Sequence, residues 1–225
     1  MTARAPRRLA AVFSLCSLLA CATARAPARR FAPATADDAR EALAAWAAVS
    51  ERAATLPASR LLYDAKMSAS GTPTVPGTLA VTYDGTSVVT ASLTGPFGSR
   101  VAEYRDGALT GQDRQAFVVD PEALRGVLAG CWNGATPSVA GFDAGQSLLT
   151  FDAGNARVSA VLDVASRSLV SMDVVGPSGH LVVDYSGTTE PWPARLTVRD
   201  ESTKKSLALK LVTVEAAGRA GSAGR

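Results

Sequence analysis

The chain has 225 residues, of which 47% are hydrophobic, and it carries 23 basic and 20 acidic residues with three cysteines. Three of the arginines lie in residues 1–20, three in residues 25–30 and two at positions 219 and 225, so residues 31–218 hold 15 basic against 20 acidic residues. That balance excludes the basic footprint of a nucleic-acid-binding domain, and the lone cysteine of that part, Cys131, excludes an internal disulfide framework.

The first twenty residues predict a cleaved signal peptide. Three arginines in residues 4–8 precede the uncharged apolar run Leu9–Ala20. As a helix this run would rise roughly 18 Å, which is too short for a hydrocarbon core of about 30 Å. A basic start followed by a short apolar segment is typical of a secretory signal.

The apolar run ends in Leu18-Leu19-Ala20-Cys21, which resembles the bacterial lipobox. The resemblance implies cleavage after Ala20 and a diacylglycerol on the Cys21 sulfur, so that the chain is a membrane-anchored lipoprotein. Ala22, in place of an aspartate, favours the periplasmic face of the outer membrane over retention at the inner one. An ordinary secretory signal with an incidental cysteine is the alternative.

Residues 21–34 form a predicted tether, rich in Ala, Pro and Arg and without an apolar period. Its arginines either lie against anionic headgroups or belong to a soluble spacer. Thr35 then caps a predicted helix that ends at Pro57, with acidic residues in its first turn. Apolar residues recur on one face of this helix at steps of three and four: Ala39, Leu43, Trp46, Val49, Ala53 and Leu56.

From Arg60 onward apolar residues recur at every second position, which indicates strands. Asp84-Gly85 predicts a tight turn between strands at 76–83 and 87–94, and Asp106-Gly107 predicts another between strands at 100–105 and 108–110. In the strand at 87–94, Val89, Ala91 and Leu93 alternate. Asp120-Pro121 opens a second, short helix that Gly130 ends.

Further short strands fill the second half of the chain, at 147–151, 157–164, 168–174, 180–185, 194–199 and 205–214. Ten or eleven strands joined by short turns predict an antiparallel meander. We therefore expect a mainly β fold: a single curved antiparallel sheet, or half-barrel, with an N-terminal helix and a short inserted helix covering its concave side. The expected organisation is a signal peptide (1–20), a tether (21–34), one domain (35–215) and a disordered tail (216–225).

Three segments of this pattern resemble the LolA/LolB-like superfamily of lipoprotein carriers, and the LolB-like outer-membrane members in particular. The first is the lipobox followed by a Trp-bearing helix and the strand that starts Arg60-Leu61-Leu62-Tyr63. The second is the loop Leu93–Gly98, followed by a strand and the helix from Asp120 to Gly130. The third is Pro191–Leu196, which leads into two closing strands.

This resemblance implies a cavity that holds acyl chains of lipoproteins or phospholipids and assists their insertion into the outer membrane, with a periplasmic LolA-like carrier as a possible partner. Acyl chains need such a dry site because each methylene in water costs about 0.8 kcal/mol. Each candidate lining residue has plain core packing as its alternative. The candidates are Leu79, Val81, Val89, Leu93, Val158, Leu162, Leu181, Val183, Leu196, Val198, Leu207 and Leu209.

Aromatic residues supply the remaining site predictions. Phe97, after Pro96 in a Gly-Pro-Phe-Gly turn, either inserts into a membrane interface or folds back onto the sheet. Trp46 is interpreted as a core anchor of its helix, Trp132 as either a cavity-rim or a core residue, and Trp192 as a turn or edge anchor.

Nothing in the sequence indicates catalysis. His180 is the only histidine, no Cys/His cluster has metal-ligand spacing, and Gly176-Pro177-Ser178-Gly179 does not complete a nucleophile motif. We therefore expect no enzyme activity, no cofactor, no metal and no nucleic-acid partner, and Cys131 as a buried structural thiol. A non-catalytic lipid sensor or assembly scaffold on the same fold is the alternative to a carrier, since fold alone does not choose between them.

Overall fold

The computed structural model describes residues 30–111, 121–131, 136–177, 179–189 and 191–217. The predicted signal peptide, Cys21, most of the tether, Trp132, Ser178 and the tail from residue 218 lie outside the described residues. The unit described below begins at Phe31. Neither of its helices is long and apolar enough to cross a membrane.

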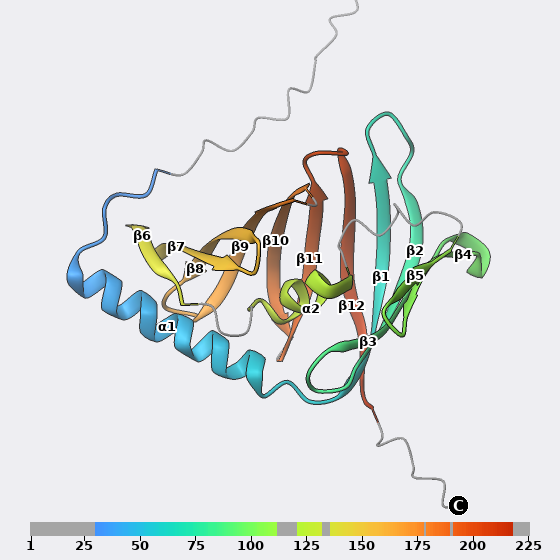
Figure 1. Cartoon of the computed structure of the whole chain (residues 1–225), viewed down its shortest axis with the longest axis horizontal. Coiled ribbons are helices and arrows are strands. Elements are labelled where there is room, and N and C mark those ends of the chain that lie inside the picture. The colour runs from blue at the N-terminus through green and yellow to red at the C-terminus, as the bar shows by residue number, and fades with distance from the viewer. Residues whose placement is uncertain (1–29, 112–120, 132–135, 178, 190, 218–225) are drawn as a thin grey trace, which may run out of the picture. The chain divides into compact units, whose positions relative to one another are not determined.

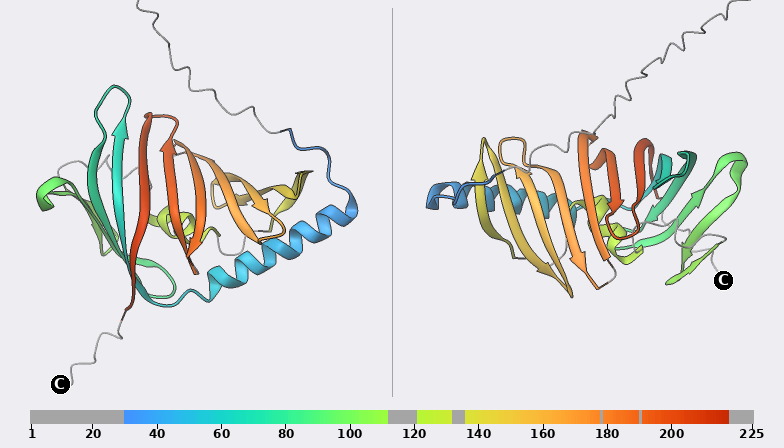
Figure 2. Two further views of the ribbon diagram at one scale, coloured as in Figure 1. Left: turned by 180° about the vertical axis from the view of Figure 1, so that it is seen from behind. Right: turned by 90° about the horizontal axis from the view of Figure 1, so that it is seen from above.

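One antiparallel sheet of twelve strands dominates the unit, and it curves without closing into a barrel, as predicted (Figures 1 and 2). The strand order is β5-β4-β3-β2-β1-β12-β11-β10-β9-β8-β7-β6. The bounds are β1 Ser59–Ala69, β2 Val75–Tyr83, β3 Val88–Thr94, β4 Arg100–Arg105, β5 Ala108–Thr110, β6 Ser138–Asp143, β7 Gln146–Ala153, β8 Ala156–Asp163, β9 Ser168–Gly176, β10 Gly179–Thr189, β11 Trp192–Asp200 and β12 Lys205–Ala216.

The sheet consists of two meanders, β1–β5 and β6–β12, because each strand pairs with its neighbour in the chain. Tight turns make this possible: Asp106 and Gly107, between β4 and β5, both have positive φ (52° and 77°), as a two-residue hairpin loop requires. Among the described strands, the two meanders join where β1 pairs with β12, from Ser59 opposite Ala216 to Ala69 opposite Lys205. The first and last strands of the chain thus lie side by side at the centre of the sheet.

The sequence analysis did not predict β6, which forms one edge of the sheet. This strand has only six residues and is irregular at Gly141. Ala32 bridges Phe142 through two backbone hydrogen bonds of 2.9 and 3.2 Å. A Cβ at Gly141 would lie 2.6 Å from the Phe31 Cβ, so glycine allows the N-terminal segment to approach this edge.

The predicted position of Val89 on the inner face is wrong. The alternation predicted Val89 on the buried face with Ala91 and Leu93, but Val88 is buried instead and Val89 is 38% exposed. The pairing explains the difference, since Thr82 lies opposite Thr90 whereas Tyr83 lies opposite Val88. The extra residue in β3 is a bulge, and it moves Val89 to the outer face.

Helix α1, Ala36–Ala54, begins at a capping box in which the Thr35 hydroxyl accepts from the Asp38 amide while the Asp38 carboxylate accepts from Thr35. Its buried residues are Ala42, Ala45, Trp46, Val49 and Ala53. Leu43, predicted on the apolar face, is 41% exposed. Trp46 packs against Phe151 of β7 with ring centroids 5.1 Å apart, so α1 covers the inner face at the β6–β8 end (Figure 1).

Helix α2, Pro121–Ala129, lies within the curve of the sheet and packs against β3 and β11 (Figures 1 and 2). Its buried apolar side chains are Leu124, Val127 and Leu128. Cys131, just after the helix, is a buried thiol, as predicted, and its Sγ lies 3.4 Å from the Ser50 hydroxyl of α1. Burial raises the pKa of that thiol.

Candidate functional site

The inner face of the sheet is a continuous apolar surface under the two helices. Ten of the twelve predicted lining residues are buried on it: Leu79, Val81, Leu93, Val158, Leu162, Val183, Leu196, Val198, Leu207 and Leu209. Leu181 is half-buried, and Val89 lies on the opposite face. Apart from tyrosine and tryptophan, the buried polar residues among those described are Ser59 and Ser147, and no charged residue belongs to this set.

Aromatic residues that the sequence analysis did not assign to the site fill the space between α2 and the sheet. Tyr83 of β2 and Trp192 of β11 meet edge to face across the curve, with ring centroids 5.3 Å apart. The Tyr185 hydroxyl of β10 donates to the Val127 carbonyl of α2 at 2.7 Å. Trp192, interpreted from the sequence as a turn or edge anchor, is instead 2% exposed in this interior.

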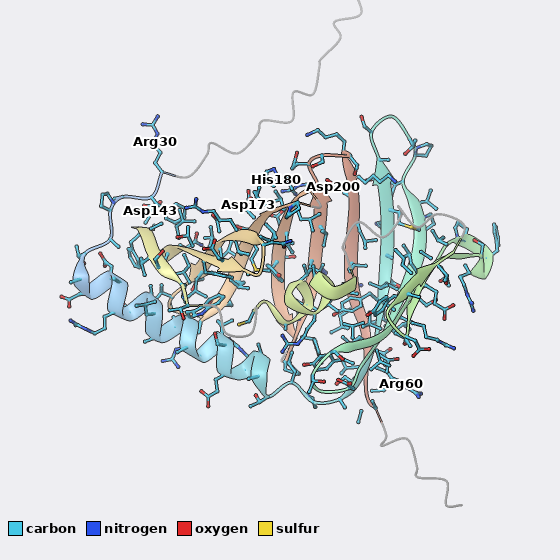
Figure 3. All side chains as sticks on the ribbon, in the orientation of Figure 1. Arg30, Arg60, Asp143, Asp173, His180 and Asp200 are labelled. Atoms are coloured by element: carbon cyan, nitrogen blue, oxygen red, sulfur yellow. The ribbon has the colours of Figure 1, made fainter. Side chains whose placement is uncertain are left out.

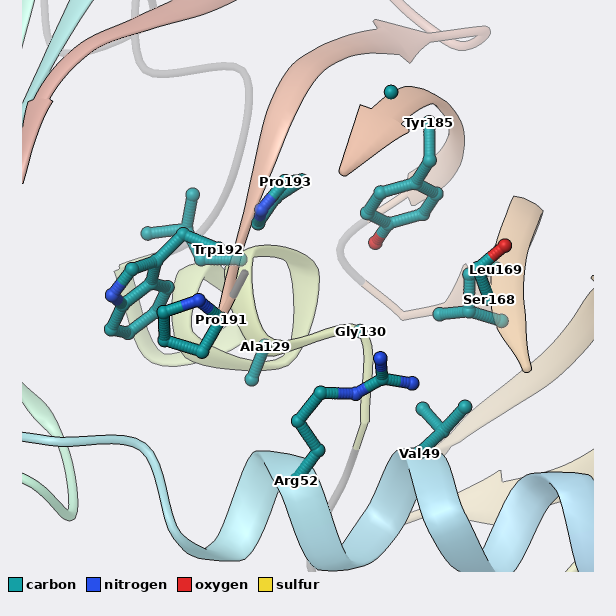
Figure 4. Close-up of a pocket in the computed structure, with 12 residues that line it drawn as sticks. Val49, Arg52, Ala129, Gly130, Ser168, Leu169, Tyr185, Pro191, Trp192 and Pro193 are labelled. Carbon is teal, nitrogen blue, oxygen red and sulfur yellow. The ribbon is translucent and has the colours of Figure 1, made fainter. Parts of the chain in front are cut away.

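A small pocket remains where the ends of both helices meet β9–β11 (Figure 4). Its volume is about 80 Å³. Pockets that hold ligands measure roughly 300 to 1,000 Å³, so this one is too small for an acyl chain. It is lined by Val49, Arg52, Leu128, Ala129, Gly130, Ser168, Leu169, Tyr185, Gly187, Pro191, Trp192 and Pro193.

Arg52 stands at the rim of this pocket. It extends from the last turn of α1, and its guanidinium donates to the Arg167 carbonyl, in the β8–β9 turn, at 2.5 Å. Figure 4 shows this side chain between α1 and Gly130. Arg52 therefore ties the end of α1 to the sheet.

A second hollow, of about 290 Å³, lies over β12 and β1–β4, and the side chains of their outer face dominate its lining. Most of its lining residues are polar or charged, including Arg60, Glu103, Arg105 and Glu215. Glu103 pairs with Arg100 at 2.6 Å and with Arg105 at 3.5 Å. This lining does not suit a hydrocarbon chain.

The only histidine of the chain lies at the rim of the sheet, near Asp173 and Asp200 (Figure 3). His180 Nε2 is 3.0 Å from Asp173 Oδ1, and the two side chains are 40% and 45% exposed. Within the described ranges, no three His, Cys, Asp or Glu side chains are grouped as metal ligands would be.

The turn between β3 and β4 presents Phe97 to solvent. Phe97 is fully exposed, and its backbone adopts the left-handed conformation with φ 60° and ψ 23°. Backbone hydrogen bonds close the turn, from Gly95 N to Ser99 O at 2.8 Å and from Ser99 N to Pro96 O at 3.3 Å. Of the two alternatives that the sequence left open, the ring therefore does not fold back onto the sheet.

This turn combines two unfavourable features. A bulky side chain in the left-handed region costs about 1–3 kcal/mol, and a fully exposed phenyl ring gains nothing from burial. Strain of this kind persists where the surroundings impose it and often marks a functional position.

Comparison with known protein families and with curated protein sequences finds no match. Among solved structures, a LolA superfamily protein from Nitrosomonas europaea is similar, with a TM-score of 0.51 and 11% identity over 75% of this chain and 92% of that one. A DUF1329 family protein from Desulfovibrio piger gives 0.47 and 6% over 80% and 94%. A putative outer membrane lipoprotein-sorting protein domain from Vibrio parahaemolyticus gives 0.49 and 9% over 79% and 92%.

At such identities the likeness concerns the fold alone, and only the first structure exceeds a TM-score of 0.5. The chain therefore has the LolA/LolB-like fold, as the sequence resemblance predicted.

Proposed function

We propose that this protein is a non-catalytic envelope lipoprotein that binds acyl chains of lipoproteins or phospholipids between its sheet and its helices. Anchored through acylated Cys21 at the periplasmic face of the outer membrane, it assists their insertion into that membrane. The observation that carries this proposal is the continuous apolar inner face, which is covered by α1 and α2 in the part of the chain that the structure describes. The LolA-like fold supports it.

Because the pocket holds only about 80 Å³, binding requires a helix to move. Helix α2 is the easier one to displace: it has nine residues, and three large apolar side chains are buried from it. Burying those side chains contributes roughly 5–9 kcal/mol before the entropy of ordering the segment is subtracted. One palmitoyl chain with about 14 methylenes gains about 11 kcal/mol on leaving water, enough to offset the loss of α2 contacts.

Phe97 has the role of membrane contact in this proposal, with Pro96 beside it. Its phenyl ring already stands in water, so transfer into the interfacial region of a bilayer buries apolar area without rearranging the fold. Backbone hydrogen bonds close the turn that presents the ring.

The closed interior favours a second candidate, the lipid sensor or assembly scaffold. A protein that spends most of its time empty and closed can report the arrival of a lipid by the movement of α2. The sensor binds the same ligands but does not hand them to a membrane.

A binding and delivery experiment tests the proposal. The full chain carrying Cys21→Ala, which lacks an acyl group of its own, is mixed with a synthetic tripalmitoylated lipopeptide and analysed by native mass spectrometry. A carrier retains the lipopeptide and releases it to phosphatidylethanolamine–phosphatidylglycerol vesicles, whereas a sensor retains it without release. Absence of any complex contradicts both candidates.

The role of Phe97 is tested by the same delivery assay. We expect Phe97→Glu to bind the lipopeptide like the parent chain and to deliver it at least tenfold more slowly. Val175→Glu is the matched control, because Val175 is a half-exposed apolar residue on β9. Equal delivery by Phe97→Glu and Val175→Glu would show that the turn plays no part.

A further inference from the structure

Tyr63 of β1 carries a hydroxyl group that the closed structure does not use. The residue is 0% exposed, and no described residue hydrogen-bonds its hydroxyl oxygen. An unpaired buried hydroxyl is costly, and native proteins contain few of them. A phenylalanine would fill the same space at lower cost, so the hydroxyl needs an explanation.

The position of Tyr63 relates it to helix α2. The helix packs against β3 on one side and β11 on the other, and β2, β1 and β12 lie between those strands in the sheet. The inner face of β1 therefore lies beneath α2. Tyr63 stands in a row with Leu79 and Leu93, which are both fully buried there.

Tyr185 is a second phenol under the same helix. Its hydroxyl donates to the Val127 carbonyl, which belongs to the last turn of α2 and so has no partner within the helix. Burial, together with the nearby Tyr63 phenol, raises the pKa of Tyr185 well above its usual value. Burial also raises the pKa of Tyr63, so both groups stay neutral donors at physiological pH.

We propose that the Tyr63 and Tyr185 hydroxyls are a donor pair for the carbonyl oxygens of ester-linked acyl chains, such as those of a diacylglyceryl group. The inference rests on the proposed function and names the part of the lipid that the interior recognises. In the closed state the Val127 carbonyl occupies one of the two donors. Displacement of α2 frees that donor, and the ester carbonyls of the ligand then accept from both.

Neutral donors select a neutral acceptor. A buried carboxylate or phosphate would need a cation beside it. Of the arginines near α2, Arg52 stands at the pocket rim, where it donates to the Arg167 carbonyl, and neither it nor Arg125 is fully buried. An ester carbonyl carries no net charge and is attached directly to the hydrocarbon chain that the apolar inner face would bury. A hydrocarbon chain that lacks the carbonyl accepts no hydrogen bond from the two hydroxyls, so the donor pair adds nothing to its affinity.

Trp192 Nε1 is also buried without a hydrogen-bond partner among the described residues. In Figure 4 this nitrogen lies on the edge of the indole that faces away from Tyr185. The Trp192 ring is in contact with Tyr83. We therefore do not include it in the donor pair.

The test compares two probes with the same chain lengths, dioctanoylglycerol and its diether analogue dioctylglycerol, by calorimetry on the full chain carrying Cys21→Ala. One net hydrogen bond corresponds to about fivefold in affinity, so we expect at least about fivefold tighter binding of the ester. Tyr63→Phe should weaken binding of the ester about fivefold and leave binding of the ether unchanged. Tyr83→Phe is the control, because its hydroxyl already donates to the Gly85 carbonyl at 2.9 Å.

Equal affinities of the parent chain for ester and ether would overturn the donor pair while leaving acyl-chain binding intact. The donor pair would also be overturned if Tyr63→Phe and Tyr185→Phe both still bound the ester more tightly than the ether. If neither probe binds, the proposed function itself fails, and the inference fails with it. Should Tyr63→Phe not fold, the Tyr185→Phe variant provides the same comparison.

Discussion

The two helices that cover the inner face differ in how firmly they are held. Helix α1 has 19 residues, a capping box at its start, five buried residues and the Arg52 contact at its end. Helix α2 has nine residues, and the described contacts that hold it include three large apolar side chains and the hydrogen bond from Tyr185. Helices this short are marginal without tertiary contacts. From this comparison we expect α1 to be the fixed part of the core and α2 the helix that moves when a ligand binds.

The largest effect is expected at the centre of α1. Trp46→Ala should lower the free energy of unfolding by about 3–5 kcal/mol, because it leaves a cavity against Phe151. Chemical denaturation measures this loss. Leu43→Ala on the exposed side of α1 should change stability by less than about 0.5 kcal/mol. A loss below 1 kcal/mol at Trp46 would show that α1 is no more fixed than α2.

A smaller effect is expected for the corresponding change in α2. Leu128→Ala should lower the free energy of unfolding by only about 1–2 kcal/mol, although a buried leucine usually contributes 2–5 kcal/mol. The reason is that α2 can detach while the sheet stays folded, and this limits the loss. The variant should also bind the tripalmitoylated lipopeptide more tightly, since its closed state is less stable. A loss as large as that of Trp46→Ala would contradict a removable α2.

Removing one hydrogen bond should loosen α2 alone. Tyr185→Phe deletes the donor to the Val127 carbonyl, a change of about 1 kcal/mol. Amide hydrogen exchange should accelerate about fivefold in α2 and stay unchanged in α1. Equal acceleration in both helices would mean that they open together.

The smallest effect concerns the start of α1 at low pH. Hydrogen bonds from the Thr35 hydroxyl and backbone lower the pKa of Asp38 below its usual 3.8. The cap therefore stabilises α1 fully above that value and loses its contribution as the pH falls through the lowered pKa. The protection of first-turn amides from exchange, taken relative to their intrinsic rate at each pH, should fall with acid in this window, and Asp38→Asn should remove that dependence.

Sequence patterns predicted much of this fold because its tight turns and the alternation of apolar and polar residues along its strands are local features. Asp-Gly pairs mark two hairpins, and period-two alternation marks the inner face at Leu79, Val81 and Leu93. Val89 was misplaced because a bulge depends on how β3 pairs with β2, which the sequence of β3 alone does not specify. Strand β6 was missed because its pairing depends on the distant Phe31-Ala32 segment and on Gly141.

The candidate site was less predictable than the sheet. Alternation identified which residues face inward, but whether they enclose open space depends on how far the sheet curves. Tyr83 and Trp192 are more than one hundred residues apart in the chain, and they meet only because that curvature brings β2 and β11 face to face. The exposure of Phe97 was one of two outcomes that the Gly-Pro-Phe-Gly turn allowed, because the sequence does not specify the left-handed backbone conformation that Phe97 adopts.

The pairing of β1 with β12 also constrains the order of events in biogenesis. These strands are separated by more than 130 residues, and no other pairing of the described strands joins the two meanders. Closing such a long loop is slow, and it cannot happen before the final strand has been synthesised. For the exported lipoprotein proposed above, this delay would keep the chain unfolded during transfer across a membrane, because the central seam forms only after the last strand has emerged on the far side.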